Sequence, residues 1–169
     1  MMRDIGFNFF WFDKYCNNFM AKGFEYTTGS IELLCAWELF EHYENPRKEI
    51  DYLFSIADSI LFSTLLYDDK LKIRSFDEWW YYAPQSGQHI CFYSKMTLEY
   101  IARTYHVHYY KISDEMHLFT KKICNEKILQ RITCTKVGKL YQWLAYLRQK
   151  VKKVSLQSSD FKKMNGESK

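Results

Sequence analysis

The sequence predicts an α/β fold with a mostly parallel sheet, closed at one edge by an antiparallel hairpin and followed by a basic helix. Residues 33–37, LLCAW, form an apolar run without the polar alternation of a half-exposed strand. Such a run suits a strand that helices cover on both faces. Residues 58–64, DSILFST, form a second run of this kind. Strand-like segments alternate with helix-like ones around both runs, which is typical of parallel sheets.

The first element that we predict is a strand at residues 7–12, FNFFWF, because this segment is short, aromatic and preceded by Gly6. Asp13 follows directly. An acidic residue at the tip of a parallel strand is where nucleotide-binding α/β folds accept hydrogen bonds from ribose hydroxyls. An Asp is also an ordinary N-cap, here for residues 14–21, so both roles stay open. We expect a short edge strand at residues 24–26.

Helices and strands alternate in the middle of the sequence. Asn45 and Pro46 predict the start of a helix, as its N-cap and first helical residue. Ser94 predicts a second N-cap. Residues 107–112 and 116–120 alternate enough to form an antiparallel hairpin at one edge of the sheet. We expect the histidines in or beside this hairpin to be structural: His106, His108 and His117.

A polar turn follows the predicted strand at residues 33–37, where ligands bind in open α/β sheets. It contains Glu38, Glu41 and His42, whose i, i+3, i+4 spacing places three ligand groups on one face of a helical turn. Two carboxylates and an imidazole suit a divalent cation, or a general base beside a substrate hydroxyl. The alternative is a solvated first turn whose acidic groups interact favourably with the helix dipole.

A long connection, residues 68–89, holds four consecutive aromatic residues at 79–82 and then Gly87 and His89. Connections of this length inside a compact domain are usually functional. Aromatic side chains beside Pro, Gly and His predict the lid of a pocket, to which His89 adds a titratable group. The alternative is a loop that its aromatic side chains hold on the surface.

Length and composition indicate one hydrophobic core, because the chain has 169 residues of which 47% are hydrophobic. The net charge of +4 does not by itself indicate nucleic-acid binding. The five cysteines are odd in number, widely spaced and without a CxxC pair, so we expect reduced thiols. The sequence shows neither a membrane span nor a secretory signal, and we expect a cytoplasmic protein.

The composition becomes more basic after residue 122. We expect one domain at residues 1–122, a basic amphipathic helical extension at 123–154 and a polar, frayed tail at 155–169. A break near Gly138 would divide the extension into two helices. The extension could dock on the domain, on a partner or on an anionic surface.

Three segments resemble those of class I S-adenosylmethionine-dependent methyltransferases: the strand ending in Asp13, AWELFEHYENP at 36–46 and WWYYAPQSGQHICFYSKMTLEYIA at 79–102. The last two are similar to the family's E-x-x-E-H-x-x-x-P and W-Y…P…G-x-H-x-x-x-[FY]-S blocks, in matching order and at suitable separation. The resemblance covers residues 5–122 and implies a Rossmann-like methyltransferase sheet with S-adenosylmethionine as cofactor.

By this resemblance, Asp13 binds the ribose hydroxyls, and Trp37 and Glu38 flank the methionine part of the cofactor. The aromatic loop closes over the substrate, with Tyr82 and His89 as catalytic residues. The E-x-x-E-H block is also similar to that of metal-assisted O-methyltransferases, such as the ubiquinone-pathway enzymes and small-RNA 2′-O-methyltransferases. That likeness implies a divalent metal such as Mg²⁺, which would lower the pKa of a substrate hydroxyl. Its ligands would be Glu38, Glu41, His42 and His89.

One departure from the family pattern concerns the N-terminus. The family's glycine-rich loop precedes the Asp-ending strand, whereas this sequence begins MMRDIG. The expected sheet therefore lacks its first strand, that loop, and a central strand between those at residues 7–12 and 33–37. We expect an N-terminally truncated methyltransferase that binds its cofactor weakly or not at all alone.

The resemblance implies O-methylation of a small molecule or a sugar. Two alternatives stay open. The missing loop favours a catalytically inactive remnant or interaction module, whereas the metal-like turn and the basic extension favour an RNA 2′-O-methyltransferase. A nicotinamide-dependent enzyme on the same kind of sheet lacks support, because the sequence holds no G-x-G-x-x-G.

Overall fold

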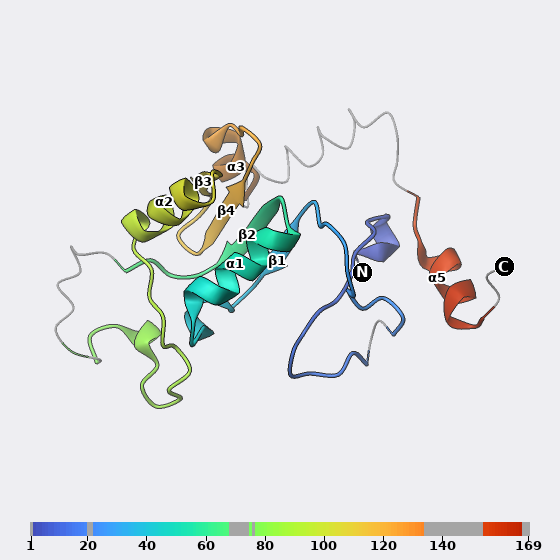
Figure 1. Cartoon of the computed structure of the whole chain (residues 1–169), viewed down its shortest axis with the longest axis horizontal. Helices are drawn as coiled ribbons and strands as arrows, with labels where there is room; N and C mark the ends of the chain where they lie inside the picture. The colour runs from blue at the N-terminus through green and yellow to red at the C-terminus, as the bar shows by residue number, and fades with distance from the viewer. Residues whose placement is uncertain (1, 20–21, 68–74, 76, 134–153, 167–169) are drawn as a thin grey trace. The chain divides into compact units, whose positions relative to one another are not determined.

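The structure, a computed structural model, describes residues 2–19, 22–67, 75, 77–133 and 154–166. The chain divides into two compact units, one built from Met1–Thr28 and Trp143–Lys169 and the other from Gly29–Gln142. The four strands that the described residues form all belong to the second unit (Figure 1). This second unit therefore holds the sheet and the core described below.

The sheet is mixed. Its strands are β1 (Leu34–Ala36), β2 (Ser59–Ser63), β3 (His108–Lys111) and β4 (Met116–Thr120), in the order β1-β2-β4-β3. β1 and β2 are parallel, whereas β2 with β4 and β3 with β4 are antiparallel. The predicted hairpin at a sheet edge is confirmed. The prediction of a mostly parallel sheet is wrong for the described strands, because this hairpin pairs directly with β2.

The two strands predicted from apolar runs are both present, but they differ in burial. Every residue of β2 except Leu61 is buried. β1 is an edge strand of the described sheet, and Leu33, just before it, is 48% exposed. An unbroken apolar run therefore predicted the strand, but it does not distinguish a central strand from an edge strand.

Two predicted helices and their N-caps are confirmed. α1 (Pro46–Ile56) begins after Asn45, whose side-chain oxygen accepts a hydrogen bond from a first-turn backbone N–H at 3.1 Å. α2 (Lys95–Thr104) begins after Ser94, which accepts a similar bond at 3.2 Å. These bonds satisfy backbone donors that have no partner within the helix. α1 packs against β2 and α2 against β3 (Figure 1).

Stacked aromatic rings form the centre of the core. Phe40, Phe62 and Phe119 are each fully buried. The ring of Phe62 stacks on that of Phe40 at 4.2 Å between centroids and on that of Phe119 at 4.9 Å. These residues come from the turn after β1, from β2 and from β4. The core thus joins the segment that carries the polar turn to the centre of the sheet.

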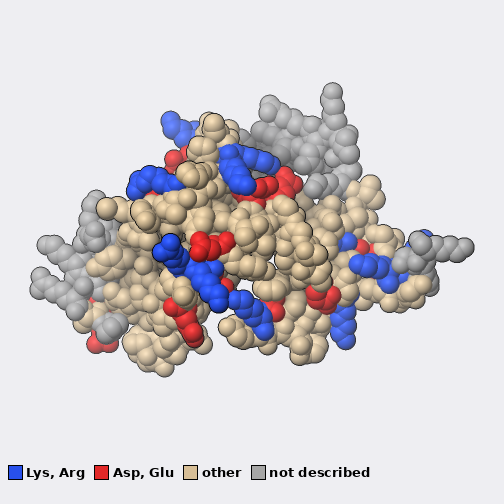
Figure 2. Space-filling view, viewed as in Figure 1, with Lys and Arg blue, Asp and Glu red and all other residues tan. Residues whose placement is uncertain are grey.

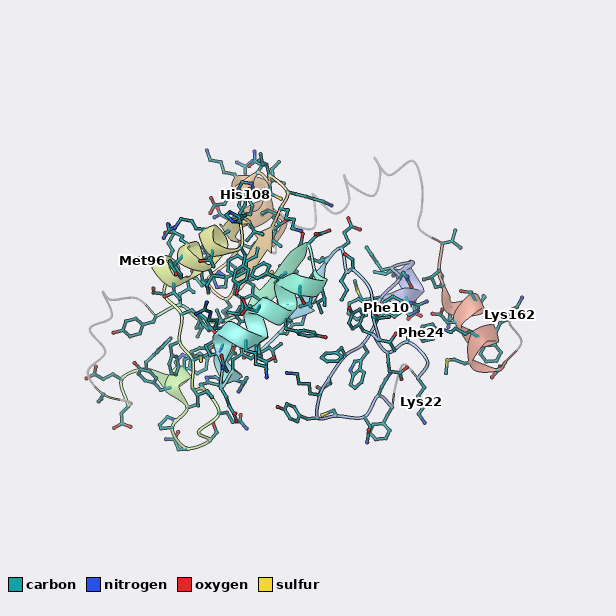
Figure 3. All side chains as sticks on the ribbon, viewed as in Figure 1. Phe10, Lys22, Phe24, Met96, His108 and Lys162 are labelled. Atoms are coloured by element: carbon teal, nitrogen blue, oxygen red, sulfur yellow. The ribbon has the colours of Figure 1, made fainter. Side chains whose placement is uncertain are left out.

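The first compact unit differs from the prediction. Residues 7–12 form no strand, and Trp11 has one isolated parallel bridge, to Glu25. Phe10 is 43% exposed, whereas Phe24 is buried. Figure 3 labels both side chains. An aromatic segment becomes a strand when a partner strand and a covering layer stabilise it. In the described part of this unit, a single bridge takes the place of a ladder.

Residues 14–21 were predicted to form a helix capped by Asp13, and the described residues of this segment form bends instead. Asp13 does behave as a cap in one respect. Its Oδ1 accepts hydrogen bonds from the backbone N–H groups of Tyr15, at 2.7 Å, and Cys16, at 2.9 Å. A side chain that closes a turn in this way offers the backbone an alternative to a helix.

The C-terminal tail predicted to fray contains a helix, α5 (Gln157–Met164). Arg3 holds it in two ways within the first unit. Its guanidinium pairs with both carboxylate oxygens of Asp160, at 2.7 and 2.8 Å, and its carbonyl accepts from the Leu156 amide at 3.1 Å. The Arg3 guanidinium also lies 4.1 Å from the ring centroid of Phe24. The prediction missed this helix because its partner is 157 residues away in sequence.

The basic extension is described in part. α3 (Glu126–Thr133) lies within it, and residues 134–153, including the predicted break near Gly138, lie outside the described residues. Figure 2 shows cationic and acidic side chains interspersed on the visible face. Two lysines just before α3 pair with acidic groups, Lys121 with Asp58 at 2.6 Å and Lys122 with Glu32 at 2.9 Å. No helix among the described residues is long and apolar enough to cross a membrane.

Candidate functional site

The polar turn after β1 is shorter than its spacing predicts. A 3-10 turn, η2, covers Phe40–His42, so Glu38 lies outside it. Glu38 has φ 47°, in the left-handed region, and its backbone N–H donates to Ser63 Oγ at 2.7 Å. The Ser63 hydroxyl in turn donates to Glu38 Oε1 at 2.8 Å. These two bonds tie Glu38 to the end of β2 and keep it off the helical face on which the sequence placed it.

Glu41 is completely buried, and this is unusual for a carboxylate. Neither of its side-chain oxygens makes a hydrogen bond of standard geometry among the described residues, although the Tyr81 hydroxyl and the Glu38 carboxyl lie close enough to affect its pKa. Its backbone carbonyl accepts from the amides of Ile90 and Cys91, at 2.9 and 3.0 Å, which joins the turn to the later loop. Burial raises the pKa of the Glu41 carboxyl, and the nearby Glu38 carboxylate acts in the same direction.

His42 and His89 present similar hydrogen bonds. His42 Nδ1 lies 3.0 Å from the Gln88 carbonyl oxygen, and His89 Nδ1 lies 2.6 Å from the Tyr81 carbonyl oxygen. A carbonyl oxygen can only accept, so Nδ1 carries the proton in both rings. In the neutral imidazole, Nε2 then has a free lone pair. A backbone carbonyl that fixes the tautomer in this way is a common feature of histidines that bind metals.

The fold brings Glu41, His42 and His89 together. One donor atom from each lies within 4.8 Å of the other two, and the two imidazole centroids are 4.9 Å apart. A buried carboxylate beside two imidazole rings fits the donor set of a divalent cation. Glu38 does not belong to this group of atoms. We call Glu41, His42 and His89 the three-residue cluster.

A methyltransferase domain family matches residues 1–106, more than half of the chain. The chain belongs to this methyltransferase domain family. The family implies a Rossmann-like fold and S-adenosylmethionine as the methyl donor. No curated protein and no solved structure matches the chain.

The match places the three-residue cluster inside the methyltransferase domain, together with β1, β2, α1 and α2. The β3–β4 hairpin lies beyond its last matched residue. The hairpin nevertheless belongs to the same sheet, since β4 pairs along the whole of β2. Contacts between β4 and the end of β2 can therefore influence the matched part of the methyltransferase domain.

The aromatic loop of the methyltransferase domain presents Tyr81, which sequence reasoning missed, beside the cluster. Tyr81 is buried, and its ring centroid lies 4.5 Å from that of His89. Tyr82, selected from sequence, instead packs its ring against Trp79 at 5.1 Å and Phe92 at 4.8 Å. Both tyrosines belong to one 3-10 turn, η4 (Trp80–Tyr82), in a run of aromatic residues. The sequence offers no pattern that distinguishes them.

Two further residues are expected to bind the cofactor, Asp13 and Trp37. Asp13 is exposed and belongs to the first compact unit. Hydrogen bonds from the backbone of Tyr15 and Cys16 hold its pKa below the usual value for Asp. Trp37 directly follows β1 and is 49% exposed. Their roles toward the ribose and the methionine part of the cofactor stay predictions.

Proposed function

We propose that this chain is an S-adenosylmethionine-dependent methyltransferase that methylates a hydroxyl oxygen of a small molecule or a sugar, with a divalent cation at the three-residue cluster. The observation that carries the proposal is the buried Glu41 carboxylate, which lacks a hydrogen-bond partner among the described residues and lies beside His42 and His89. Buried polar groups without a partner are rare in folded proteins, and such a group indicates an ion or another ligand.

The donor set differs from the one that Mg²⁺ prefers. Mg²⁺ favours oxygen ligands, whereas one carboxylate and two imidazoles suit Mn²⁺, Fe²⁺ or Zn²⁺ better. Glu38, which would add a second carboxylate, is hydrogen-bonded to Ser63. We therefore propose Glu38, with its sequence neighbour Trp37, as a cofactor contact, and the binding of ribose hydroxyls by Asp13 is a separate prediction. A cation bound at the cluster would lower the pKa of an acceptor hydroxyl and so favour its attack on the methyl group.

The chain's own residues would hold and deprotonate the acceptor. The bond from His89 Nδ1 to the Tyr81 carbonyl fixes the imidazole in one tautomer. Its Nε2 can then accept a proton from a hydroxyl, as a general base does, or bind the cation. Tyr82, packed on Phe92, would contact the acceptor from the aromatic loop. Transfer itself is an in-line displacement, to which a protein contributes mostly alignment.

A titration of the purified full chain with MnCl₂ tests the metal part of the proposal. We expect saturable binding at one site in the wild type, and loss of that binding in Glu41→Gln and His89→Ala. Glu38→Gln and His108→Ala serve as controls, because Glu38 bonds to Ser63 and His108 is exposed on β3. Equal Mn²⁺ binding by the wild type and Glu41→Gln would contradict the assignment.

RNA 2′-O-methylation is the second candidate function. The observation in its favour is that α3 exposes Lys127 and Arg131. The test is fluorescence anisotropy of a labelled single-stranded RNA at 50 and 200 mM salt. Neutralisation of several phosphates predicts a steep fall in affinity across this range, since each contact releases counterions. Salt-independent or undetectable binding would reject RNA as the acceptor.

A further inference from the structure

His117 in β4 is a buried polar residue that the proposed chemistry does not use. It is fully buried, and both of its ring nitrogens have partners. Nε2 lies 3.0 Å from the Thr64 carbonyl oxygen, which can only accept, so Nε2 carries the proton. Nδ1 then accepts from the Tyr109 hydroxyl at 3.0 Å. Burial lowers the pKa of His117 to about 4, so the ring is neutral near pH 7.

Thr64 is the residue through which His117 reaches the site. It directly follows β2 and is 1% exposed. Three of its polar atoms have partners: its N–H donates to the Glu115 carbonyl at 2.9 Å, its carbonyl accepts from His117, and its hydroxyl lies 3.3 Å from the Tyr81 hydroxyl. A residue bound at three atoms has little freedom to move.

Tyr81 connects Thr64 to the three-residue cluster. Its hydroxyl meets Thr64 at one end of the side chain, and its backbone carbonyl accepts the His89 Nδ1 proton at 2.6 Å. The Tyr81 hydroxyl also lies near enough to Glu41 to affect the pKa of that carboxyl. Hydrogen bonds thus connect the hairpin to His89 through His117, Thr64 and Tyr81.

We propose that His117 is a positioning residue, which acts through Thr64 and Tyr81 to hold His89 in the tautomer and orientation that leave its Nε2 free. The proposal rests on the proposed function, in which His89 binds the cation or accepts a proton. An apolar side chain would fill the same core position without any bond to Thr64. A side chain that only fills space in the core would not need the hydrogen bond from His117 Nε2 to the Thr64 carbonyl.

Nuclear magnetic resonance of the ¹⁵N-labelled full chain tests this directly, because long-range ¹H–¹⁵N correlations report the protonated nitrogen of each imidazole. In the wild type we expect His89 to carry its proton on Nδ1. Thr64→Val removes the hydroxyl that meets Tyr81, and His117→Leu removes the bond to the Thr64 carbonyl. Both should lower the Nδ1-protonated fraction of His89 and weaken Mn²⁺ binding, by less than the roughly 10- to 100-fold that follows loss of a hydrogen bond made directly to a metal ligand.

Two control variants separate positioning from stability. His117→Gln keeps an amide donor for the Thr64 carbonyl and should retain both wild-type properties. Thr120→Val removes another buried hydroxyl contact between β2 and β4, 2.8 Å from Ser59 Oγ, at the opposite end of these strands. It should destabilise the fold without changing His89. If His117→Leu fails to fold, Thr64→Val and the two control variants still show whether the hydrogen bonds through Thr64 position His89.

The proposal is overturned if folded Thr64→Val keeps the His89 tautomer and the Mn²⁺ affinity of the wild type. It is overturned equally if Thr120→Val changes His89 as much as Thr64→Val does. Failure of the proposed function looks different. If the wild type binds no Mn²⁺, the metal assignment fails, whereas the tautomer comparison still decides whether His117 positions His89.

Discussion

Among single residues, Glu41 has the least ordinary surroundings. An ionised carboxylate without a hydrogen-bond partner is costly to bury, and Glu41 is completely buried. A protein retains such a carboxylate where the group binds a ligand and so stabilises the ligand-bound state. In our account that is a cation, which His42 and His89 would hold with it. Replacement of the Glu41 carboxylate should therefore raise the stability of the metal-free protein and lower its affinity for the cation.

Glu41→Gln tests this opposition. Without metal, we expect the variant to be more stable than the wild type at pH 8, by on the order of 1 kcal/mol, because an amide stays neutral at every pH whereas burial of the Glu41 carboxyl opposes its ionisation. With excess MnCl₂, the melting temperature of the wild type should rise and that of Glu41→Gln should not. Thermal unfolding with and without MnCl₂ measures both. A variant that loses stability without metal, and gains as much from Mn²⁺ as the wild type, would contradict the account.

His117 predicts a pH dependence of stability. Its pKa is about 4 in the folded chain and 6.5 in an ordinary environment, so at intermediate pH the unfolded chain binds the proton and the folded chain does not. This contribution to stability is complete above pH 6.5 and is lost as the pH falls toward 4. The full loss is roughly 3 kcal/mol, of which about 2 kcal/mol is lost by pH 5.

Urea unfolding at pH 7.5 and pH 5 checks this value. His117→Gln has no proton to bind at this position and should lose about 2 kcal/mol less than the wild type between the two pH values. Carboxylates elsewhere titrate equally in both proteins, so the difference isolates His117. An identical pH dependence in the two proteins would mean that His117 is protonated in the folded state.

At the scale of elements, the sequence predicted those helices and strands whose start or pairing depends on neighbouring residues. Asn45, Pro46 and Ser94 mark helix starts because their side chains or backbone suit the first turn of a helix. The β3–β4 hairpin was also predicted from its short connection and alternating residues. The failures are elements whose partners are distant in sequence. The 7–12 segment has strand composition without a ladder, and α5 forms beside Arg3, 157 residues from Asp160.

Asn45 provides a prediction at this scale. Asn45→Ala removes the acceptor of the first-turn N–H of α1 and should reduce the free energy of unfolding by about 1 kcal/mol. Asn45→Asp keeps an oxygen acceptor at the same position and should stay near the wild-type value. Urea denaturation of the three proteins measures the difference. A negligible effect of Asn45→Ala would show that α1 draws its stability from the core alone.

For the molecule as a whole, the sequence motifs located the site better than they located its geometry. The E-x-x-E-H block and His89 were selected together, and the fold does bring Glu41, His42 and His89 within 4.8 Å of one another. The position of Glu38 was not predictable, because it depends on a left-handed backbone and on Ser63 from another strand. Tyr81 was likewise indistinguishable from Tyr82 until the turn was folded.

The link between the β3–β4 hairpin and the site was also not predictable from the sequence motifs. β4 lies beyond the matched residues of the methyltransferase domain, and its histidine was expected to be structural. The register that places His117 opposite Phe62 also brings its ring to the Thr64 carbonyl at the end of β2. Such a link arises from strand pairing and has no signature in the local sequence. It makes the hairpin part of our account of the site.

We expect this member of the methyltransferase domain family to use S-adenosylmethionine as its methyl donor. Isothermal titration of the full chain with S-adenosylhomocysteine, with and without MnCl₂, tests it most directly, and ATP serves as a control nucleotide. We expect saturable one-site binding of S-adenosylhomocysteine that is weaker than micromolar, and no binding of ATP. Micromolar affinity would in addition contradict the expectation of weak cofactor binding. A cooperatively folded chain that binds no S-adenosylhomocysteine in either condition would contradict methyltransferase activity of this chain alone and would favour the inactive remnant or interaction module.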